Sequence, residues 1–219
     1  MQARTEWRRL LVVEKSVVED VEIVEELDAT VSLVAHVRPT SRAASRCGKC
    51  GRRAGRYDGG EGRRRWRGLD FGEVLVFLEA DAPRVRCRDH GVVVAGVPWA
   101  RHGAGHTHAF DQQVAWLATQ SSKTAITVLM RIAWRTVGAI VARYWADTAA
   151  ALDQFAGLRK IGVDEISYKR GHKYLTVVVD HDTGRLVWAA PGRDKATLNS
   201  FFDALAASSP FTGETAGED

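Results

Sequence analysis

The sequence predicts an α+β chain built from several small modules, and three observations lead to this fold class. Residues 17–25 and 29–37 alternate apolar and polar side chains, as strands of a small antiparallel unit do. Residues 110–145 instead carry apolar side chains at helical spacing. Three further strand signals follow, at residues 160–166, 174–179 and 185–190. A helical pattern at 195–207 then completes the order: small β unit, helices, α/β portion.

The composition is that of a globular chain in a reducing compartment. Its 219 residues, 45% hydrophobic and 26% charged, suffice for ordinary buried cores. No run approaches the roughly 18 consecutive apolar residues that cross a membrane, and the first residues lack the apolar core of a secretory signal. Three cysteines without such a signal argue against a disulfide framework. We therefore expect a cytoplasmic protein, not a membrane protein, whose reduced thiols have another task.

Positive charge is concentrated in one segment. Residues 46–67 contain nine Lys or Arg residues and two acidic residues, whereas residues 1–45 contain six basic and eight acidic residues. This block favours a polyanionic partner such as nucleic acid, because arginine makes forked contacts with phosphate. A merely solvated surface is the alternative. The candidate DNA contacts in this segment are Arg52, Arg53, Arg63, Arg64, Arg65 and Arg67.

Two close pairs of potential metal ligands lie 36 residues apart. Cys47 and Cys50 form the first pair, and Cys87 and His90 form the second with the same spacing. Three thiolates and one imidazole are a common closed ligand set for structural zinc, so the four residues predict a zinc site. The alternative is three reduced thiols and a surface histidine. A histidine-containing loop follows, with His102, His106 and His108, and its spacing favours a solvated loop over a second metal site.

The helical middle is consistent with a helix-turn-helix. Ser121 and Ser122 are placed to cap a short helix, and residues 130–133 interrupt the helical pattern before a further helix begins at Trp134. In such an arrangement Arg135, Thr136 and Arg131 would face the major groove, with Arg143 nearer the phosphates. An ordinary helical hairpin fits the spacing equally well.

Carboxylates follow two of the later strand signals. An apolar strand runs into Asp164 and Glu165, whose side chains point to opposite faces of a sheet, and another strand ends at Asp180. Nucleases that use two Mg²⁺ ions need carboxylates converging from strand ends. Residues 180–184, with Asp and Gly, are equally suited to a plain hairpin turn.

Taken together, the motifs resemble the ISL-three family of bacterial insertion-sequence transposases. Besides the cysteine pairs, the similarity rests on the sequences at residues 66–70, 97–100, 133–137, 161–167, 171–175, 179–180 and 192–195. The resemblance implies a zinc-binding N-terminal segment, a helix-turn-helix and the start of a ribonuclease-H-like catalytic domain that uses Mg²⁺. It further implies binding of double-stranded DNA at the element's terminal inverted repeats, on the bacterial nucleoid. Asp164 would be the first catalytic acid, with Asp180 near it.

Two departures from the family pattern shape the functional expectation. His90 stands where the family usually has a fourth cysteine, which preserves four ligands. After residues 209–211 only a polar tail with Glu214, Glu218 and Asp219 remains, so the second and third acids are expected to be missing. We therefore expect a truncated transposase that binds DNA without cutting it. The alternative is a stand-alone zinc and helix-turn-helix protein that represses transposition.

The expected organisation has four parts. They are an N-terminal β segment (1–45), a zinc-binding basic module (46–100), a helix-turn-helix (101–150) and an incomplete ribonuclease-H-like domain (151–219). The last part would leave a strand edge and a sheet face uncovered. We therefore expect marginal stability or homo-oligomer formation through residues 160–219.

Overall fold

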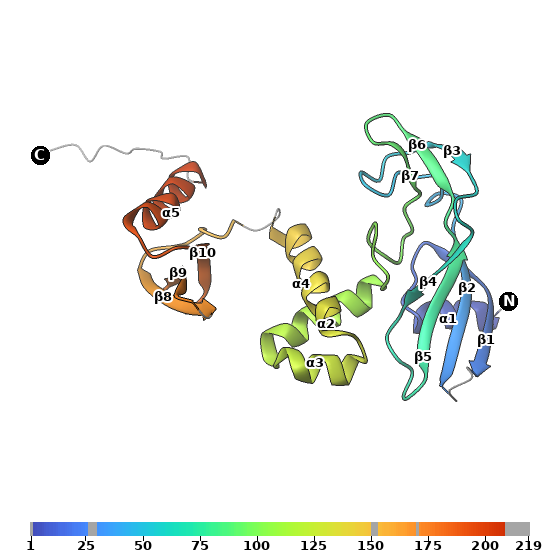
Figure 1. The fold of residues 1–219 in the computed structure, drawn as a ribbon. Helices are drawn as coiled ribbons and strands as arrows, with labels where there is room; N and C mark the ends of the chain where they lie inside the picture. The colour runs from blue at the N-terminus through green and yellow to red at the C-terminus, as the bar shows by residue number, and fades with distance from the viewer. Residues whose placement is uncertain (1, 26–29, 150–152, 170, 209–219) are drawn as a thin grey trace, which may run out of the picture. The chain divides into compact units, whose positions relative to one another are not determined.

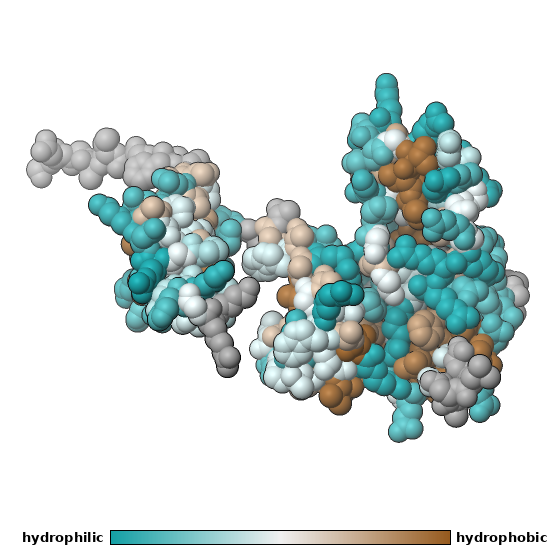
Figure 2. Space-filling view, viewed as in Figure 1, coloured by the Kyte–Doolittle hydropathy of each residue, from teal (hydrophilic) through white to brown (hydrophobic). Residues whose placement is uncertain are grey.

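The computed structural model describes residues 2–25, 30–149, 153–169 and 171–208. The chain divides into two compact units, Met1–Tyr144 and Trp145–Asp219, which are treated separately (Figure 1). The connection between the strand signals at 17–25 and 29–37, where the sequence predicts a turn near Leu27 and Asp28, lies outside the described residues, as does the polar tail. Figure 2 shows mostly hydrophilic atoms over the strands of the first unit. The predicted α+β class is confirmed.

A four-stranded sheet forms the base of the first unit. Its strands, in spatial order, are β1 (Ser16–Glu25), β2 (Val31–Pro39), β5 (Leu75–Asp81) and β4 (Arg63–Arg67). β2 and β5 run parallel, and the other neighbours are antiparallel. Strands from both sides of residue 45 therefore share one sheet, although the sequence placed a module boundary there. The four expected boundaries themselves stay predictions.

One face of this sheet is apolar. It packs against α1 (Gln2–Leu10) and against residues 97–100, which follow the zinc-ligand pairs. Leu78 and Val37 are buried, and Trp7 of α1 packs against the same cluster. Trp66 of β4 meets Trp99 edge to face, with ring centroids 5.5 Å apart. Trp66, the one apolar residue of β4, is buried, and its neighbour Arg65 points to the exposed face. The sequence analysis missed this strand because its arginines were interpreted only as charge.

A second, three-stranded sheet carries the cysteines. It consists of β3 (Gly55–Asp58), β6 (Arg84–Cys87) and β7 (Gly91–Val94), all antiparallel. Its core contains only four buried residues, Cys47, Val85, Cys87 and Val93. All three strands have four residues, and only β6 alternates exposed arginines with buried residues, Val85 and Cys87.

Three helices follow: α2 (His108–Gln120), α3 (Lys123–Met130) and α4 (Trp134–Ala149), of which α4 continues past Tyr144, the last residue of the first unit. Thr107 caps α2 and Ser122 caps α3, each accepting a bond from a backbone N–H three residues on. α3 ends at Arg131, whose backbone is left-handed (φ 51°). The next helix starts three residues later at an angle of 101°. This short turn and near-right angle are those of a helix-turn-helix.

The apolar stripes of these helices form one core. Phe110 and Val114 of α2 pack with Ile126 of α3 and with Val137 and Ile140 of α4. Among the described residues no single helix is long and apolar enough to cross a membrane; α3 and α4 meet that test only when joined as a bent pair.

The second unit contains an antiparallel sheet of order β10-β9-β8, with a helix that follows it in sequence. The elements are β8 (Ile161–Lys169), β9 (Lys173–Asp180), β10 (Leu186–Pro191) and α5 (Lys195–Ser208). Phe201 of α5 is fully buried against Val178 and Val187. β8 lies at the sheet edge, where Ile161, Val163 and Ile166 are 37–47% exposed. All four elements lie close to the predicted ranges.

Candidate functional site

The four predicted metal ligands lie together, although they come from segments 36 residues apart. Their ligand atoms are all within 4.8 Å of one another. The Sγ atoms of Cys50 and Cys87 are 3.8 Å apart, and His90 Nδ1 lies 3.6 Å from the sulfur of Cys87 and 3.7 Å from that of Cys47. A tetrahedral zinc ion with ordinary Zn–S and Zn–N bonds would separate two sulfurs by about 3.8 Å, and a sulfur and a nitrogen by about 3.6 Å. The pocket therefore has the dimensions of a zinc tetrahedron.

The local electrostatics favour thiolates at two of the three sulfurs. The hydrogen bond with the His90 side chain is the main reason that the pKa of Cys87 falls to about 6. The backbone N–H of Arg52 is the main cause of the lowered pKa of Cys50. Burial raises the pKa of Cys47, so this thiol has the greater need of a bound cation to ionise. A dication at the centre of the group would hold all three sulfurs as thiolates.

The three histidines of the following loop do not form a second metal group with the other described residues. His102 lies over the first cysteine pair: a Cβ added to Gly48 would be 2.3 Å from His102 Nδ1, so this close packing requires glycine. His106 stacks on Phe110, with ring centroids 4.9 Å apart. His108 is the first residue of α2.

His106 is expected to make the first unit sensitive to acid. Burial is the main reason that its pKa falls to about 4, aided by Arg143 and Arg67. The unfolded chain, with a histidine pKa near 6.5, therefore takes up a proton before the folded chain does. The stability contributed by neutral His106 is complete above about pH 6.5 and is lost as the pH falls towards 4. His106→Phe, which keeps the stacking, should remove roughly 1–2 kcal/mol of this loss at pH 4.5 after allowance for partial exposure.

The measurement is urea unfolding of both proteins at pH 7.5 and pH 4.5. Because Nδ1 of His106 is buried with no hydrogen-bond partner, the phenylalanine variant should be as stable as the unchanged chain at pH 7.5 or more so. Equal acid sensitivity of the two proteins would rule out His106 as the titrating group.

The start of α4 presents exposed side chains. Arg135 is exposed and Thr136 is half-buried. Trp134 is 55% exposed, and the Lys123 ammonium lies 4.6 Å from the centre of its ring. Exposed polar side chains in the first turn after a 101° bend are what a recognition helix presents to a groove. The structure thus leaves Arg135 and Thr136 available for the predicted contact.

Arg131, also predicted to face the groove, lies elsewhere. Its guanidinium forms an ion pair with Asp70 and donates to the carbonyl of Glu73 at 2.9 Å. Both acceptors lie in the connection between β4 and β5, 58–61 residues away in sequence. Arg131 therefore fastens the end of α3 to the sheet. Three of its donors are committed to protein acceptors while the side chain stays 40% exposed, so the groove contact predicted for Arg131 stays a prediction.

Arg67 and Arg143 also contact acidic residues of the protein. Arg67 is only 7% exposed, forms an ion pair with Asp70, and lies over the ring of Phe110. Burial lowers its pKa. Arg143 points to the carboxylate of Asp111, which is fully buried, at 3.9 Å. The enclosed guanidinium of Arg67 is not placed to bind DNA, whereas the side chain of Arg143 is 32% exposed and its predicted phosphate contact stays a prediction.

The remaining arginines of the basic segment lie at the surface. Arg63 and Arg65 both pair with Glu79 on the neighbouring strand, at 2.9 and 2.7 Å, and Arg52 pairs with Asp89. Arg64 donates to the carbonyl of Ala104 at 2.8 Å. Arg53 is exposed. These five residues keep guanidinium groups near solvent, although part of their charge is balanced within the protein.

The two predicted catalytic acids do not converge. Asp164 is exposed on β8 and lies opposite Val177, whereas Asp180 lies opposite Ile161, three residues away from Asp164. Because side chains alternate along a strand, the two carboxylates point to opposite faces of the sheet. Asp180 is 5% exposed and caps the hairpin turn, accepting bonds from the Asp182 backbone and the Thr183 hydroxyl, which lower its pKa. Asp180 therefore stabilises a turn, and the expectation that it lies beside Asp164 is wrong.

Sequence reasoning missed the acids that hold the arginines. Asp70 and Asp111 each bind arginines from other parts of the chain, and Arg101 contacts Asp111 at 3.2 Å. One signal was present, since Asp111 interrupts an otherwise uncharged helix start. Its partners are not local and gave no signal.

Comparison with known proteins shows the same three parts in the same order. Residues 43–90 match a family described as the zinc-finger of transposase IS204/IS1001/IS1096/IS1165. Residues 97–145 match the helix-turn-helix domain of transposase family ISL3, and residues 161–212 match the transposase family model of ISL3. No solved structure matches the chain.

Two curated relatives extend these matches. The chain is 66% identical over 204 residues to the transposase for insertion sequence element IS1557 of Mycobacterium tuberculosis, which covers 92% of this chain and 46% of that protein. It is 28% identical over 190 residues to the transposase for IS1001 of Bordetella parapertussis, covering 86% and 45%. The chain thus spans just under half the length of these relatives. With its zinc-finger, helix-turn-helix and transposase segments in collinear order, the chain belongs to the ISL3 family of transposases.

Proposed function

We propose that this chain is a zinc-stabilised DNA-binding protein that recognises the terminal inverted repeats of an insertion sequence. The observation that carries the proposal is the exposed first turn of α4, presented at 101° to α3 on a bundle that Arg131 fastens to the sheet. A recognition helix needs such a rigid base to reach base edges reproducibly. Zinc at Cys47, Cys50, Cys87 and His90 would fix the fold of the neighbouring basic segment.

DNA binding, rather than strand cleavage, is the activity that the described residues support. The only group of three or more potential ligands among them is the cysteine and histidine set. Asp164 and Asp180 face opposite sides of their sheet and do not fit a shared Mg²⁺ ion. Occupation of the element's ends by this chain would then repress transposition, acting in the cytoplasm on the nucleoid.

We assign a role to the parts expected from the sequence. Residues 46–100 and 101–150 would supply the DNA contacts. Residues 151–219 would carry Asp164 and, through the exposed apolar edge of β8, favour homo-oligomer formation.

A direct test is fluorescence anisotropy with a duplex of the terminal inverted repeat and a duplex of the same composition in shuffled order. We expect tighter binding to the repeat and a steep loss of affinity with salt. Samples supplied with Mg²⁺ should stay uncut. Equal affinity for both duplexes would contradict recognition of the repeats.

Arg135 is expected to carry sequence preference. Arg135→Ala should reduce the discrimination between repeat and shuffled duplex by about 1–3 kcal/mol, because a base contact distinguishes sequences. Arg53→Ala removes an exposed arginine of the basic segment and should weaken binding to both duplexes by the same factor. If the two variants behave identically, α4 is not the reading helix.

A further inference from the structure

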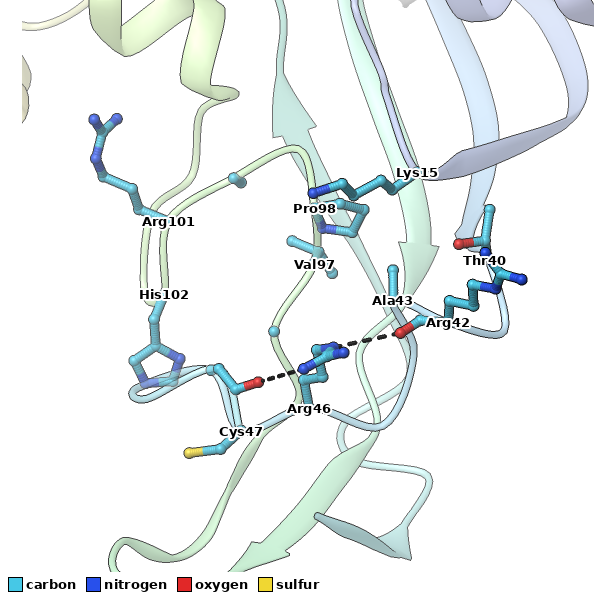
Figure 3. Close-up of a pocket in the computed structure, with 14 residues that line it drawn as sticks. Lys15, Thr40, Arg42, Ala43, Arg46, Cys47, Val97, Pro98, Arg101 and His102 are labelled. Carbon is cyan, nitrogen blue, oxygen red and sulfur yellow. Dashed lines mark hydrogen bonds between the residues drawn. The ribbon is translucent and has the colours of Figure 1, made fainter. Parts of the chain in front are cut away.

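The first unit contains a basic cavity of about 640 Å³ where three distant segments meet (Figure 3). Lys15 and Thr40 come from the open end of the β1–β2 pair, Arg46 from the approach to the first cysteine pair, and residues 96–102 from the connection to the helices. The backbone N–H of Thr40 donates to the Lys15 carbonyl at 2.9 Å, which fixes one wall of the cavity.

The lining is positively charged and holds no acidic residue. Four Lys or Arg side chains contribute to it: Lys15, Arg42, Arg46 and Arg101. Arg101 is paired with Asp111, and in Figure 3 it extends away from the other labelled side chains. Within the described part of the chain, Lys15 and Arg42 make no ion pair. The cavity therefore has a surplus of positive charge.

Arg46 offers the most directional donors. Its Nη1 donates to the Gly51 carbonyl at 3.0 Å and its Nε to the Arg42 carbonyl at 3.4 Å, as drawn in Figure 3. Both acceptors are neutral, so the guanidinium keeps its charge, and at least three of its five N–H donors remain for a ligand. The two backbone bonds hold the group in place, which reduces the entropy lost on binding.

Lys15 adds a second cation from an unusual backbone position. Its φ is 55°, in the left-handed region that glycine or asparagine adopts at lower cost. In Figure 3 its side chain extends towards Pro98, so that the ammonium lies at the cavity. A lysine in this conformation is explained if its side chain is needed there.

The remaining lining suits a sugar. Ala43, Val97, Pro98 and Ala100 are small or apolar, and the His102 ring packed over Gly48 closes one side. A single inorganic anion would leave most of this volume unfilled, whereas a phosphodiester with its flanking deoxyribose would contact both the cations and the apolar wall.

We propose that this cavity binds one backbone phosphodiester of duplex DNA, with Lys15 and Arg46 as the phosphate ligands. The inference rests on the proposed function and adds a contact made by neither the recognition helix nor the arginines of residues 52–67. A phosphate clamp of this kind fixes the position of the protein on the duplex and carries no sequence information.

The test is Lys15→Gln in the full chain, with Lys173→Gln as a matched control that removes the same charge from an exposed position of the second unit. Lys15→Gln should weaken binding to repeat and shuffled duplexes by the same factor, roughly fivefold. It should also lower the slope of log affinity against log salt by about 0.9.

A duplex series with one phosphate at a time replaced by neutral methylphosphonate identifies the contact. At one position, the methylphosphonate should weaken DNA binding by the unchanged chain. The same methylphosphonate should not weaken binding by Lys15→Gln any further, because the two changes remove the same interaction. Additive losses at every position, or equal behaviour of the lysine variants, would overturn the inference and leave the proposed function standing.

Inorganic phosphate alone distinguishes a free anion from DNA. Its binding is followed by phosphorus NMR line broadening at constant ionic strength. Lys15-dependent binding of phosphate together with a DNA affinity unchanged by Lys15→Gln would assign the cavity to a free anion and contradict the proposal. If the unchanged chain binds no DNA at all, both the proposed function and this inference fail.

Discussion

Replacing His90 by alanine is expected to unfold the cysteine-bearing sheet and leave the larger sheet folded. The unfolded segments should be residues 46–58 and 84–95, which contain all four ligands together with β3, β6 and β7. A strong zinc chelator should have the same effect on the unchanged chain, and metal analysis before treatment should find about one zinc per chain.

The expected effect is large because this sheet has almost no other source of stability. Two of its four buried core residues, Cys47 and Cys87, are themselves ligands. Val85 and Val93 alone contribute roughly 1.5–3 kcal/mol each when buried, less than the conformational entropy lost by ordering about 25 residues. Structural zinc in small domains contributes about 10–16 kcal/mol of apparent binding free energy, so its loss reverses the balance.

Hydrogen exchange followed by mass spectrometry measures the outcome for each segment. In His90→Ala, amide protection should vanish in β6 and β7 and persist in β2 and β5. His181→Ala, which removes an exposed histidine of the second unit, is the matched control and should leave both sheets protected. A His90→Ala protein that keeps full protection in β6 after chelation would refute the zinc assignment.

The zinc ligands were predictable because their signal is local. Each pair spans four residues, and a tetrahedral ion constrains which residue types can fill those positions. The helix boundaries were likewise local: Ser122 caps α3, and the interruption before Trp134 marks the turn. The interval of 36 residues between the ligand pairs did not matter, because the ion itself brings the pairs together.

The individual DNA contacts were predictable only in part, because an arginine's role depends on which acids the fold brings to it. Arg135 and Arg53 are exposed, as the sequence analysis assumed. Arg131 and Arg67 bind Asp70, and Arg143 faces Asp111, 32 residues away in sequence. The density of arginine and lysine at residues 46–67 predicted a positively charged surface. It could not distinguish a guanidinium that meets phosphate from one that joins two elements.

The sheet of the second unit shows the same limit for acids. Asp164 and Asp180 both end apolar runs, and each taken alone fits a catalytic ligand. Only the register of β8 against β9 decides whether the two carboxylates share a face of the sheet. Asp180 pairs with Ile161, three residues from Asp164, and this odd offset places the carboxylates on opposite faces. The hairpin at 180–184, which the sequence offered as the alternative for Asp180, is the structure observed.

Asp111→Ala is expected to destabilise the first unit by about 3–5 kcal/mol, because it removes the carboxylate from a buried ion-pair group. Asp111 is 0% exposed, contacts Arg101 at 3.2 Å, and faces Arg143 of α4 at 3.9 Å. Without it, the partly buried guanidinium groups of Arg101 and Arg143 lose this carboxylate. Thermal unfolding should show a fall in Tm of roughly 8–15 °C. Asp20→Ala, at an exposed position of β1, should change the free energy of unfolding by less than about 0.5 kcal/mol.

A second variant separates the lost ion pair from the lost packing. Replacing Asp111, Arg101 and Arg143 together by leucine and two methionines removes every charge of the group and should recover most of the stability, since a buried ion pair is often no more stable than a packed apolar one. The triple variant should nevertheless bind the inverted repeat more weakly if the ion pairs also fix α4, and with it Arg135, at the angle a groove requires. A single Asp111→Ala protein as stable as the unchanged chain would show that the arginines reach water, and that packing at Phe110, Val114 and Ile140 alone holds the three helices together.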